Sequence, residues 1–245
     1  MSKLLVKLCN MTIRTHDRIL VSNVNVEIKP QKITALCGVS GSGKSLTARA
    51  IMGVLDVDPG LQEGELYYPE LSDKNWFAGV GKKGMRAQRR LLSQTRHLRG
   101  KYFTYSPQSA SSALNPGRTI GRQIELAIAR RDSPPNNMAE EVRRILDEVG
   151  LRADAARSLP SELSGGMCQR AALAIAIAPA PRLVVADEPE TGLDPVLRRT
   201  VIELLVNTCR QNSAGLLLIS HHEDTVRRIA DDVVRLTPHR GVQHE

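Results

Sequence analysis

Residues 38–45 are Gly38-Val39-Ser40-Gly41-Ser42-Gly43-Lys44-Ser45, which fits the pattern G-x-x-x-x-G-K-[ST]. A short apolar run precedes this stretch and a helical pattern follows it. The glycines let the backbone curl, so that several N–H groups point into one concavity beside a helix N-terminus. Lys44 has the reach to contact the β- and γ-phosphates of a nucleotide, and the Ser45 hydroxyl is a suitable Mg²⁺ ligand. The stretch therefore predicts a strand, a phosphate-binding loop and a helix, with Gly38 to Leu46 as the nucleotide-binding residues.

A second chemical signal is the run Leu183-Val184-Val185-Ala186-Asp187-Glu188, in which a buried strand ends in two carboxylates. In open α/β sheets, ligands bind at the carboxyl ends of the strands. We expect Asp187 to hold Mg²⁺, directly or through water, and Glu188 to polarise an attacking water as general base. Alone, such a run is often only a strand that meets solvent. Together with the phosphate loop, it predicts nucleotide hydrolysis.

The apolar patterns along the chain predict an α/β fold. Residues 4–13 and 19–28 alternate in part between apolar and polar and are rich in Val and Ile, which is typical of half-buried antiparallel strands. Short apolar runs typical of buried strands occur at 33–37, 102–105, 182–186 and 216–219. Helices are expected at 46–55, 82–98, 119–130, 139–149, 167–178 and 195–209. Residues 56–75 are rich in Pro, Gly and Asp and are expected to form a loop with short strands.

The composition is that of a globular protein, with 41% hydrophobic and 24% charged residues in 245. The longest apolar run, residues 171–181, is about half of the ~20 residues that a membrane-spanning helix needs. No export signal is expected at the N-terminus. The four cysteines form no C-x-x-C pair, so we expect reduced thiols in a cytosolic protein and no zinc site. Any membrane role must then come from docking to partners.

The net charge of +8 is unevenly placed, because no acidic residue occurs between Asp73 and Glu125. That gap contains Lys82, Lys83, Arg86, Arg89, Arg90, Arg96, Arg99 and Lys101. The segment is either a solvated basic surface, a patch that faces anionic lipid or an acidic partner, or a nucleic-acid surface. Aromatic residues flank the basic run without interleaving with it, which argues against nucleic acid.

The most specific stretch is Leu163-Ser164-Gly165-Gly166-Met167-Cys168-Gln169-Arg170, which ends 17 residues before Asp187. It resembles the signature sequence of ABC ATPases. Ser-Gly-Gly opens a helix, whose first N–H groups have no partner within the helix. In this family the signature covers the γ-phosphate bound to the facing subunit. The resemblance therefore implies a head-to-tail dimer with two ATP molecules, in which Leu163, Ser164, Gly165, Gly166 and Gln169 act in trans.

Three further elements follow in the family's order. Gln108 resembles the Q-loop glutamine, which contacts Mg²⁺ and the water and senses the membrane subunit. Gly192-Leu193-Asp194 resembles the D-loop, so Asp194 is expected at the dimer interface. His221 resembles the switch histidine that contacts the γ-phosphate, and His222 is expected to be structural or at the surface. The resemblance thus implies catalytic roles for Glu188, His221 and Gln108. It implies metal contacts for Ser45, Gln108 and Asp187.

The chain is most similar to the peptide/nickel importer ATPases of this family. The similar stretches are Ser112-Ala113-Leu114-Asn115-Pro116 through Thr119-Ile120-Gly121, then Lys44-Ser45-Leu46-Thr47, and Arg99-Gly100-Lys101. The resemblance implies uptake of a small solute such as a peptide, nickel or a metal chelate. It also implies integral-membrane permease subunits, a second ABC ATPase that is either a copy or a paralogue, and an extracytoplasmic solute-binding protein. The expected location is peripheral, on the cytoplasmic face of the inner membrane, with MgATP as substrate and no nucleic acid.

The implied fold is a P-loop NTPase core with a mostly parallel sheet, an N-terminal antiparallel β subdomain and an inserted α-helical subdomain. Residues 1–245 form a single ABC ATPase domain, with residues 1–84 and 166–245 as the nucleotide-binding core. Residues 85–165 carry the Q-loop and the helical insertion.

The sequence departs from the family pattern at three places. No aromatic residue lies near Thr15 or His16 to stack on adenine, Glu190 replaces the usual Thr, and Ser109-Ala110 replaces the usual acid and Pro. Two other functions stay open at this point. One is a mechanical ATPase that acts on nucleic acid or protein assemblies, which the basic segment 82–101 motivates. The other is the ATPase of an exporter.

Overall fold

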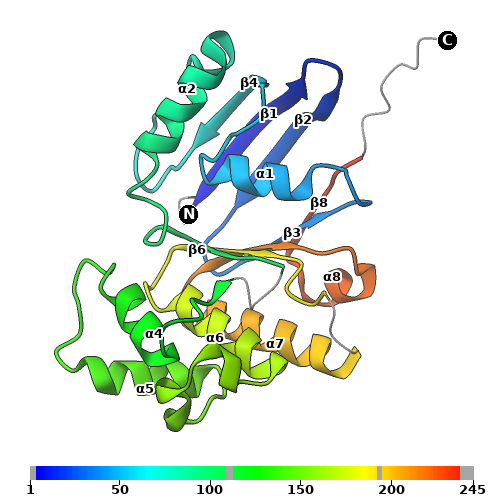
Figure 1. Ribbon diagram of the computed structural model, residues 1–245. Coiled ribbons are helices and arrows are strands. Elements are labelled where there is room, and N and C mark those ends of the chain that lie inside the picture. The colour runs from blue at the N-terminus through cyan, green and yellow to red at the C-terminus, as the bar shows by residue number, and fades with distance from the viewer. Residues whose placement is uncertain (1–3, 109–112, 192–194, 238–245) are drawn as a thin grey trace. The chain divides into compact units, whose positions relative to one another are not determined.

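The computed structural model describes residues 4–108, 113–191 and 195–237 (Figure 1). The chain divides into two compact units. The first unit comprises residues 1–99 and 217–245, and the second comprises residues 100–216.

An antiparallel sheet in the first unit confirms the predicted N-terminal β subdomain. It consists of β1 (Val6–Thr15), β2 (Ile19–Ile28) and β4 (Pro59–Tyr67), in the order β2-β1-β4. Buried and exposed side chains alternate along much of β2, as expected for a sheet with one covered face.

The prediction for residues 56–75 was wrong in one respect, because β4 is a nine-residue strand paired with β1 along most of its length. Leu61 and Leu66 of β4 are buried in the core. The glycines that indicated a loop instead lie at strand positions where the backbone conformation or a close neighbour disfavours a side chain. Gly64, with φ of 130°, lies where β1 changes register, and a Cβ on it would lie 2.9 Å from the Cα of Met11.

Parallel strands form the other sheet of the first unit. Here β3 (Ile33–Cys37) pairs in parallel with β8 (Asp232–Arg235), and its other neighbour is β7 (Gly215–Ile219), of which residues 217–219 belong to this unit. Every residue of β3 is buried.

The helices of this unit are α1 (Lys44–Ile51), α2 (Val80–Gln94) and α8 (Glu223–Ile229). The patterns predicted neither β8 nor α8.

Helix α2 packs closely on β4, and Figure 1 shows the two elements beside each other. Gln88 is fully buried, and its Nε2 donates to the carbonyl oxygens of Val57 at 3.0 Å and Pro59 at 2.9 Å. A Cβ on Gly81 would lie 2.5 Å from the carbonyl oxygen of Gln62, so only glycine permits this approach. The buried contacts leave the arginine-bearing face of α2 exposed.

The second unit contains β5 (Phe103–Ser106), which pairs in parallel with β6 (Leu183–Asp187), followed in sheet order by the start of β7. All five residues of β6 are buried, as predicted for a parallel strand. The helices are α4 (Ile120–Ile128), α5 (Met138–Glu148), α6 (Gly165–Ile177) and α7 (Pro195–Gln211), with the 3₁₀ turns η1 (Ala153–Arg157) and η2 (Pro160–Glu162). The side chains of Thr119, Asn137 and Ser164 cap α4, α5 and α6 by accepting backbone N–H groups.

The four cysteines are free thiols, as predicted. Within the described ranges, the chain has no helix that combines the length and the apolar composition needed to cross a bilayer.

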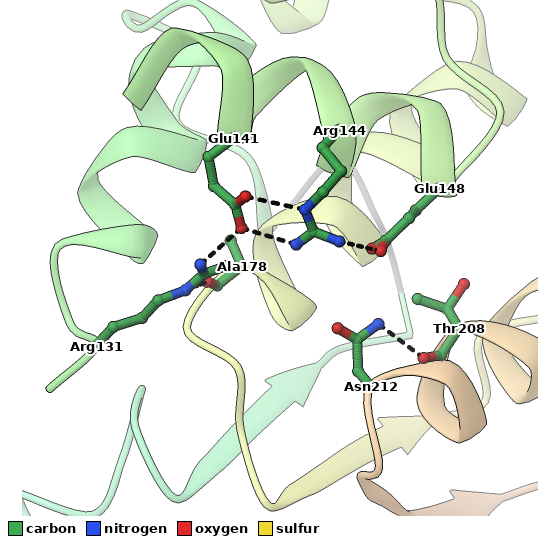
Figure 2. A network of polar contacts seen from close by, with 7 residues as sticks. All are labelled: Arg131, Glu141, Arg144, Glu148, Ala178, Thr208 and Asn212. Carbon is green, nitrogen blue, oxygen red and sulfur yellow. Dashed lines mark hydrogen bonds and ion pairs between the residues drawn. The ribbon is translucent and has the colours of Figure 1, made fainter. Parts of the chain in front are cut away.

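A charged network ties α5 to the end of α6 within the second unit (Figure 2). Arg131 donates through Nε to the carbonyl oxygen of Ala178 at 2.7 Å and through Nη1 to Glu141 at 2.6 Å. Arg144 contacts both Glu141 and Glu148. Hydrogen bonds from Arg144 are the main cause of a lowered pKa of Glu141, about 2 instead of 4.5. Glu141 and Arg131 are only 14% and 17% exposed, so solvent screens this pair little.

We expect the Glu141→Gln variant to unfold with a free energy about 2–3 kcal/mol lower than that of the wild type at neutral pH. A carboxylate with a depressed pKa stabilises the fold above its unfolded pKa, and this contribution is lost as the pH falls. The difference between variant and wild type should therefore shrink between pH 4.5 and about 2. Urea denaturation over this pH range measures it. Glu125→Gln is the control, because the Arg122–Glu125 pair is exposed and its loss should cost less than about 0.5 kcal/mol.

Candidate nucleotide site

The loop between β3 and α1, in the first unit, requires glycine at both ends. Gly38 has φ of 150°, and a Cβ there would lie 2.4 Å from the carbonyl oxygen of Leu236. Gly43 has φ of 90°, and its Cβ would lie 2.1 Å from Cγ1 of Val21. The curled path of residues 38–43 is therefore fixed by close packing against neighbouring strands.

The polar groups of this loop suit a phosphate chain. Lys44 is buried, and its Nζ donates to the carbonyl oxygens of Gly38 at 2.9 Å and Val39 at 3.1 Å. The buried Ser42 hydroxyl has no hydrogen-bond partner within the described residues. Helix α1 has no capping side chain and no acidic residue in its first turn. The Lys44 ammonium group and the uncapped start of α1 thus lie together at this loop, an arrangement that suits binding of a phosphate chain.

His221 lines the same hollow as three residues of the loop. This hollow has a volume of about 540 Å³, and its walls include Gly38, Val39, Ser40 and His221. The turn before α8 is held by the Ser220 hydroxyl, which accepts the N–H of His222 at 3.1 Å. The rings of His221 and His222 pack with centroids 4.1 Å apart. The structure therefore places the predicted switch histidine beside the predicted phosphate loop.

The charged residues Arg235 and Glu223 of this hollow were not predicted from the sequence. Arg235 at the end of β8 donates through Nη1 to Glu223 Oε1 at 3.2 Å, and both side chains line the hollow. No motif marks either residue. Arg235 lies beside the loop because β8 pairs in parallel with β3, and Glu223 begins α8, two residues after His221.

The second unit brings the predicted carboxylates together with residues from β5 and the segment after it. Asp187 is 8% exposed, and its Oδ2 accepts the Tyr105 hydroxyl at 2.9 Å. Glu188 Oε2 accepts Nε2 of Gln108 at 3.3 Å and the Thr191 hydroxyl at 3.1 Å. Glu188 has φ of 47°, a left-handed backbone conformation that is uncommon for residues other than glycine. Gln108 and Glu188 are thus adjacent, while Tyr105 and Thr191 were not predicted.

The signature stretch forms the start of α6. The Ser164 hydroxyl accepts the N–H of Met167 at 3.3 Å and so caps the helix. Among the described residues, a Cβ built on Gly165 or Gly166 would meet no atom within 4 Å beyond its own helix backbone and chain neighbours, so this helix end is open there. Gln169 donates through Nε2 to the carbonyl oxygen of Pro189, which ties α6 to the segment after Glu188.

The sequence model described as ABC transporter matches residues 21–191, a range that contains the phosphate loop, Gln108, the signature stretch and both carboxylates. The chain belongs to the ABC transporter family.

Curated members of the ABC transporter family confirm the similarity to peptide-importer ATPases. The oligopeptide transport ATP-binding protein OppD of Lactococcus lactis subsp. cremoris is 32% identical over 87% of this chain and 60% of its own length. A putative peptide import ATP-binding protein of Brucella ovis is 33% identical over 94% of this chain and 67% of its own. The glutathione import ATP-binding protein GsiA of Escherichia coli is 31% identical over 89% and 34%. The chain thus spans about three fifths of OppD and about a third of GsiA.

Solved structures of ABC cassettes have the same fold. CbiO1 of Clostridium perfringens superposes with a TM-score of 0.73 at 21% identity, covering 96% of this chain and 85% of that one. The cassette MJ0796, in a dimeric post-hydrolysis state bound to ADP and phosphate, superposes with a TM-score of 0.72 at 23% identity, covering 96% and 97%. The predicted fold class is therefore confirmed.

The predictions for the D-loop aspartate and for the adenine-stacking position are not confirmed by the described structure. Asp194, expected at a dimer interface of the ABC cassette, lies outside the described residues. His16 stands where the family resemblance leads us to expect an aromatic residue, and its Nε2 lies 3.3 Å from Asp58 Oδ2 at the surface.

Proposed function

We propose that this chain binds and hydrolyses ATP as a subunit of an ABC importer for a small solute. The observation that carries the proposal is a phosphate loop and an open signature helix in one chain that is 32% identical to an oligopeptide importer ATPase. The solute class that this similarity favours is a peptide, with nickel or a metal chelate as the alternatives.

Phosphate binding is the role of the first unit in this proposal. Lys44 would exchange the carbonyl oxygens of Gly38 and Val39 for β- and γ-phosphate oxygens, and the loop N–H groups would hold the remaining oxygens. His221 would contact the γ-phosphate. The exposed Ser45 hydroxyl is an oxygen ligand of the kind that Mg²⁺ prefers, and the Asp187 carboxylate of the second unit is another. When bound, Mg²⁺ neutralises charge that develops on the phosphates.

Water activation is the role of the second unit. Glu188 would accept a proton from the attacking water as general base. Gln108 and Thr191 both donate to Oε2 of Glu188, so they orient the carboxylate that would accept this proton. Tyr105 fixes Asp187 in the same way.

Completion of the site needs a second ABC cassette, either a copy of this chain or a paralogue. Ser164 and Gly166 lie at the start of α6, where a Cβ on Gly166 would meet nothing within 4 Å among the described residues beyond its own helix backbone and chain neighbours, which suits an anion presented by a facing protomer. Leu163, Gly165 and Gln169 would support this contact, and Asp194 would cross the interface.

Coupling to transport needs integral-membrane permease subunits, whose cytoplasmic helices would dock near Gln108. We further propose an extracytoplasmic solute-binding protein in the complex and a peripheral position on the cytoplasmic face of the inner membrane.

A pull-down from detergent-solubilised membranes tests this assignment. We expect the tagged chain to co-purify with two permease subunits and an ABC ATPase in near-equal amounts. Recovery of only soluble proteins or nucleic acid would contradict the importer assignment and would favour a mechanical ATPase.

A further inference from the structure

A second hollow, of about 390 Å³, lies in the first unit between α2 and the segment that precedes it. Its polar walls are Lys74, Asn75 and Trp76 on one side and Arg86, Arg90 and Gln94 of α2 on the other. None of the phosphate-loop residues lines it, and neither does any acidic residue.

Positive charge gathers at this hollow without compensation. Arg86 and Arg90 are one helical turn apart on α2, where two like charges destabilise a helix. Lys74 adds a third charge from the opposite wall. Among the residues that the structure describes, no carboxylate forms an ion pair with any of these three. The arrangement stores electrostatic repulsion that a bound anion would relieve.

The wall that carries Lys74 is fixed to β4 before any ligand binds. Asn75 Oδ1 accepts the backbone N–H groups of Leu66 at 3.2 Å and Phe77 at 3.0 Å, and the N–H of Trp76 donates to the carbonyl oxygen of Leu66 at 2.8 Å. Because the Asn75 side-chain oxygen already accepts these two hydrogen bonds, the group that Asn75 can offer to a ligand is its amide N–H donors. Since Gln88 anchors α2 to the same strand, both walls are pre-organised.

The Lys74 ammonium is also held in place. Its Nζ lies 4.4 Å from the centroid of the Trp76 ring, and that ring packs against Tyr68 at 5.3 Å between centroids. Trp76 is the only tryptophan of the chain. Trp76 fluorescence therefore reports on the surroundings of this hollow.

We propose that this hollow is an anion site that binds a phosphate group. Two guanidinium groups offer the forked N–H donors that match phosphate oxygens, and Lys74 and the Asn75 amide complete the set from the other wall. A donor set with three positive charges and no acceptor carboxylate suits a multiply charged oxyanion. The phosphate group belongs either to a small soluble phosphate or to an anionic phospholipid headgroup, and the two sources call for separate probes.

The test is a titration of Trp76 fluorescence in the full-length chain at constant ionic strength. The probes are inorganic phosphate in one arm, and vesicles of phosphatidylglycerol against vesicles of phosphatidylcholine in the other. The double variant R86M/R90M removes the charges of the hollow. The variant R89M/R96M is the matched control, because it removes the same charge from exposed side chains that do not line the hollow. Neither variant should change ATP turnover.

We expect a saturable fluorescence change whose affinity falls at least about tenfold in R86M/R90M and less than about twofold in R89M/R96M. Saturation by inorganic phosphate identifies a soluble phosphate as the ligand source. Saturation by phosphatidylglycerol vesicles alone identifies the lipid headgroup. The proposal is overturned if neither probe saturates, or if both double variants weaken binding equally, since diffuse surface charge would then explain the effect.

Discussion

Replacement of Glu188 by glutamine is expected to lower ATP turnover roughly 10²–10⁴-fold while ATP binding is retained. The amide cannot accept the proton of the attacking water, although it has the size of the carboxylate. Binding should persist because Lys44 and the loop glycines, which grip the phosphates in our proposal, are unchanged. Steady-state hydrolysis and equilibrium binding of a fluorescent ATP analogue measure the two effects separately.

Thr191→Val is the control for this prediction. It removes one of the two hydrogen bonds to Glu188 Oε2 and leaves the one from Gln108. We expect turnover to fall only about two- to tenfold, in line with the loss of a single orienting hydrogen bond. If the Glu188→Gln variant hydrolysed ATP at the wild-type rate, Glu188 could not be the general base.

Gly166→Glu is expected to reduce ATP turnover more than about 100-fold without unfolding the chain. A Cβ at this position would meet nothing within 4 Å in the part of the chain that the structure describes, apart from its own helix backbone and chain neighbours, so the isolated protomer should tolerate the substitution. A carboxylate there would repel the γ-phosphate of a facing protomer and cover the open helix end. Thermal denaturation and ATP binding should match the wild type, and only hydrolysis should fail.

Gly117→Glu is the matched control, since Gly117 is also exposed and, among the described residues, its Cβ would meet only Asn115 Oδ1, at 3.6 Å. It introduces the same charge in the same unit, outside the signature stretch. Equal loss of turnover in both variants would mean that added negative charge, and not the signature position, is responsible.

The phosphate loop and the signature helix were predictable because their chemistry is local. The glycines, Lys44 and Ser45 occupy fixed spacings, and Ser164 followed by two glycines marks a helix start at the sequence level. The buried strands β3 and β6 were predictable for the same reason, since each is a continuous apolar run.

Contacts between distant residues were not predictable. Tyr105 reaches Asp187 only because β5 and β6 pair in parallel, and no local pattern records that pairing. Strand β8 has only four residues, two of them exposed, so the sequence contains no apolar run that would indicate a strand there. The position of Arg235 in the hollow beside the phosphate loop was therefore not predicted. In β4, two glycines suggested a loop, but Gly64 permits the irregular register with β1, and Gly60 permits the close approach of the Gln88 side chain.

The central claim is that one protomer holds the phosphates and another completes the site. Its most direct test is ATP turnover per chain over a series of protein concentrations, with the mass of each sample determined by sedimentation. We predict that turnover per chain falls towards zero as the protein becomes monomeric. Constant turnover per chain in samples that sediment as monomers would contradict the claim.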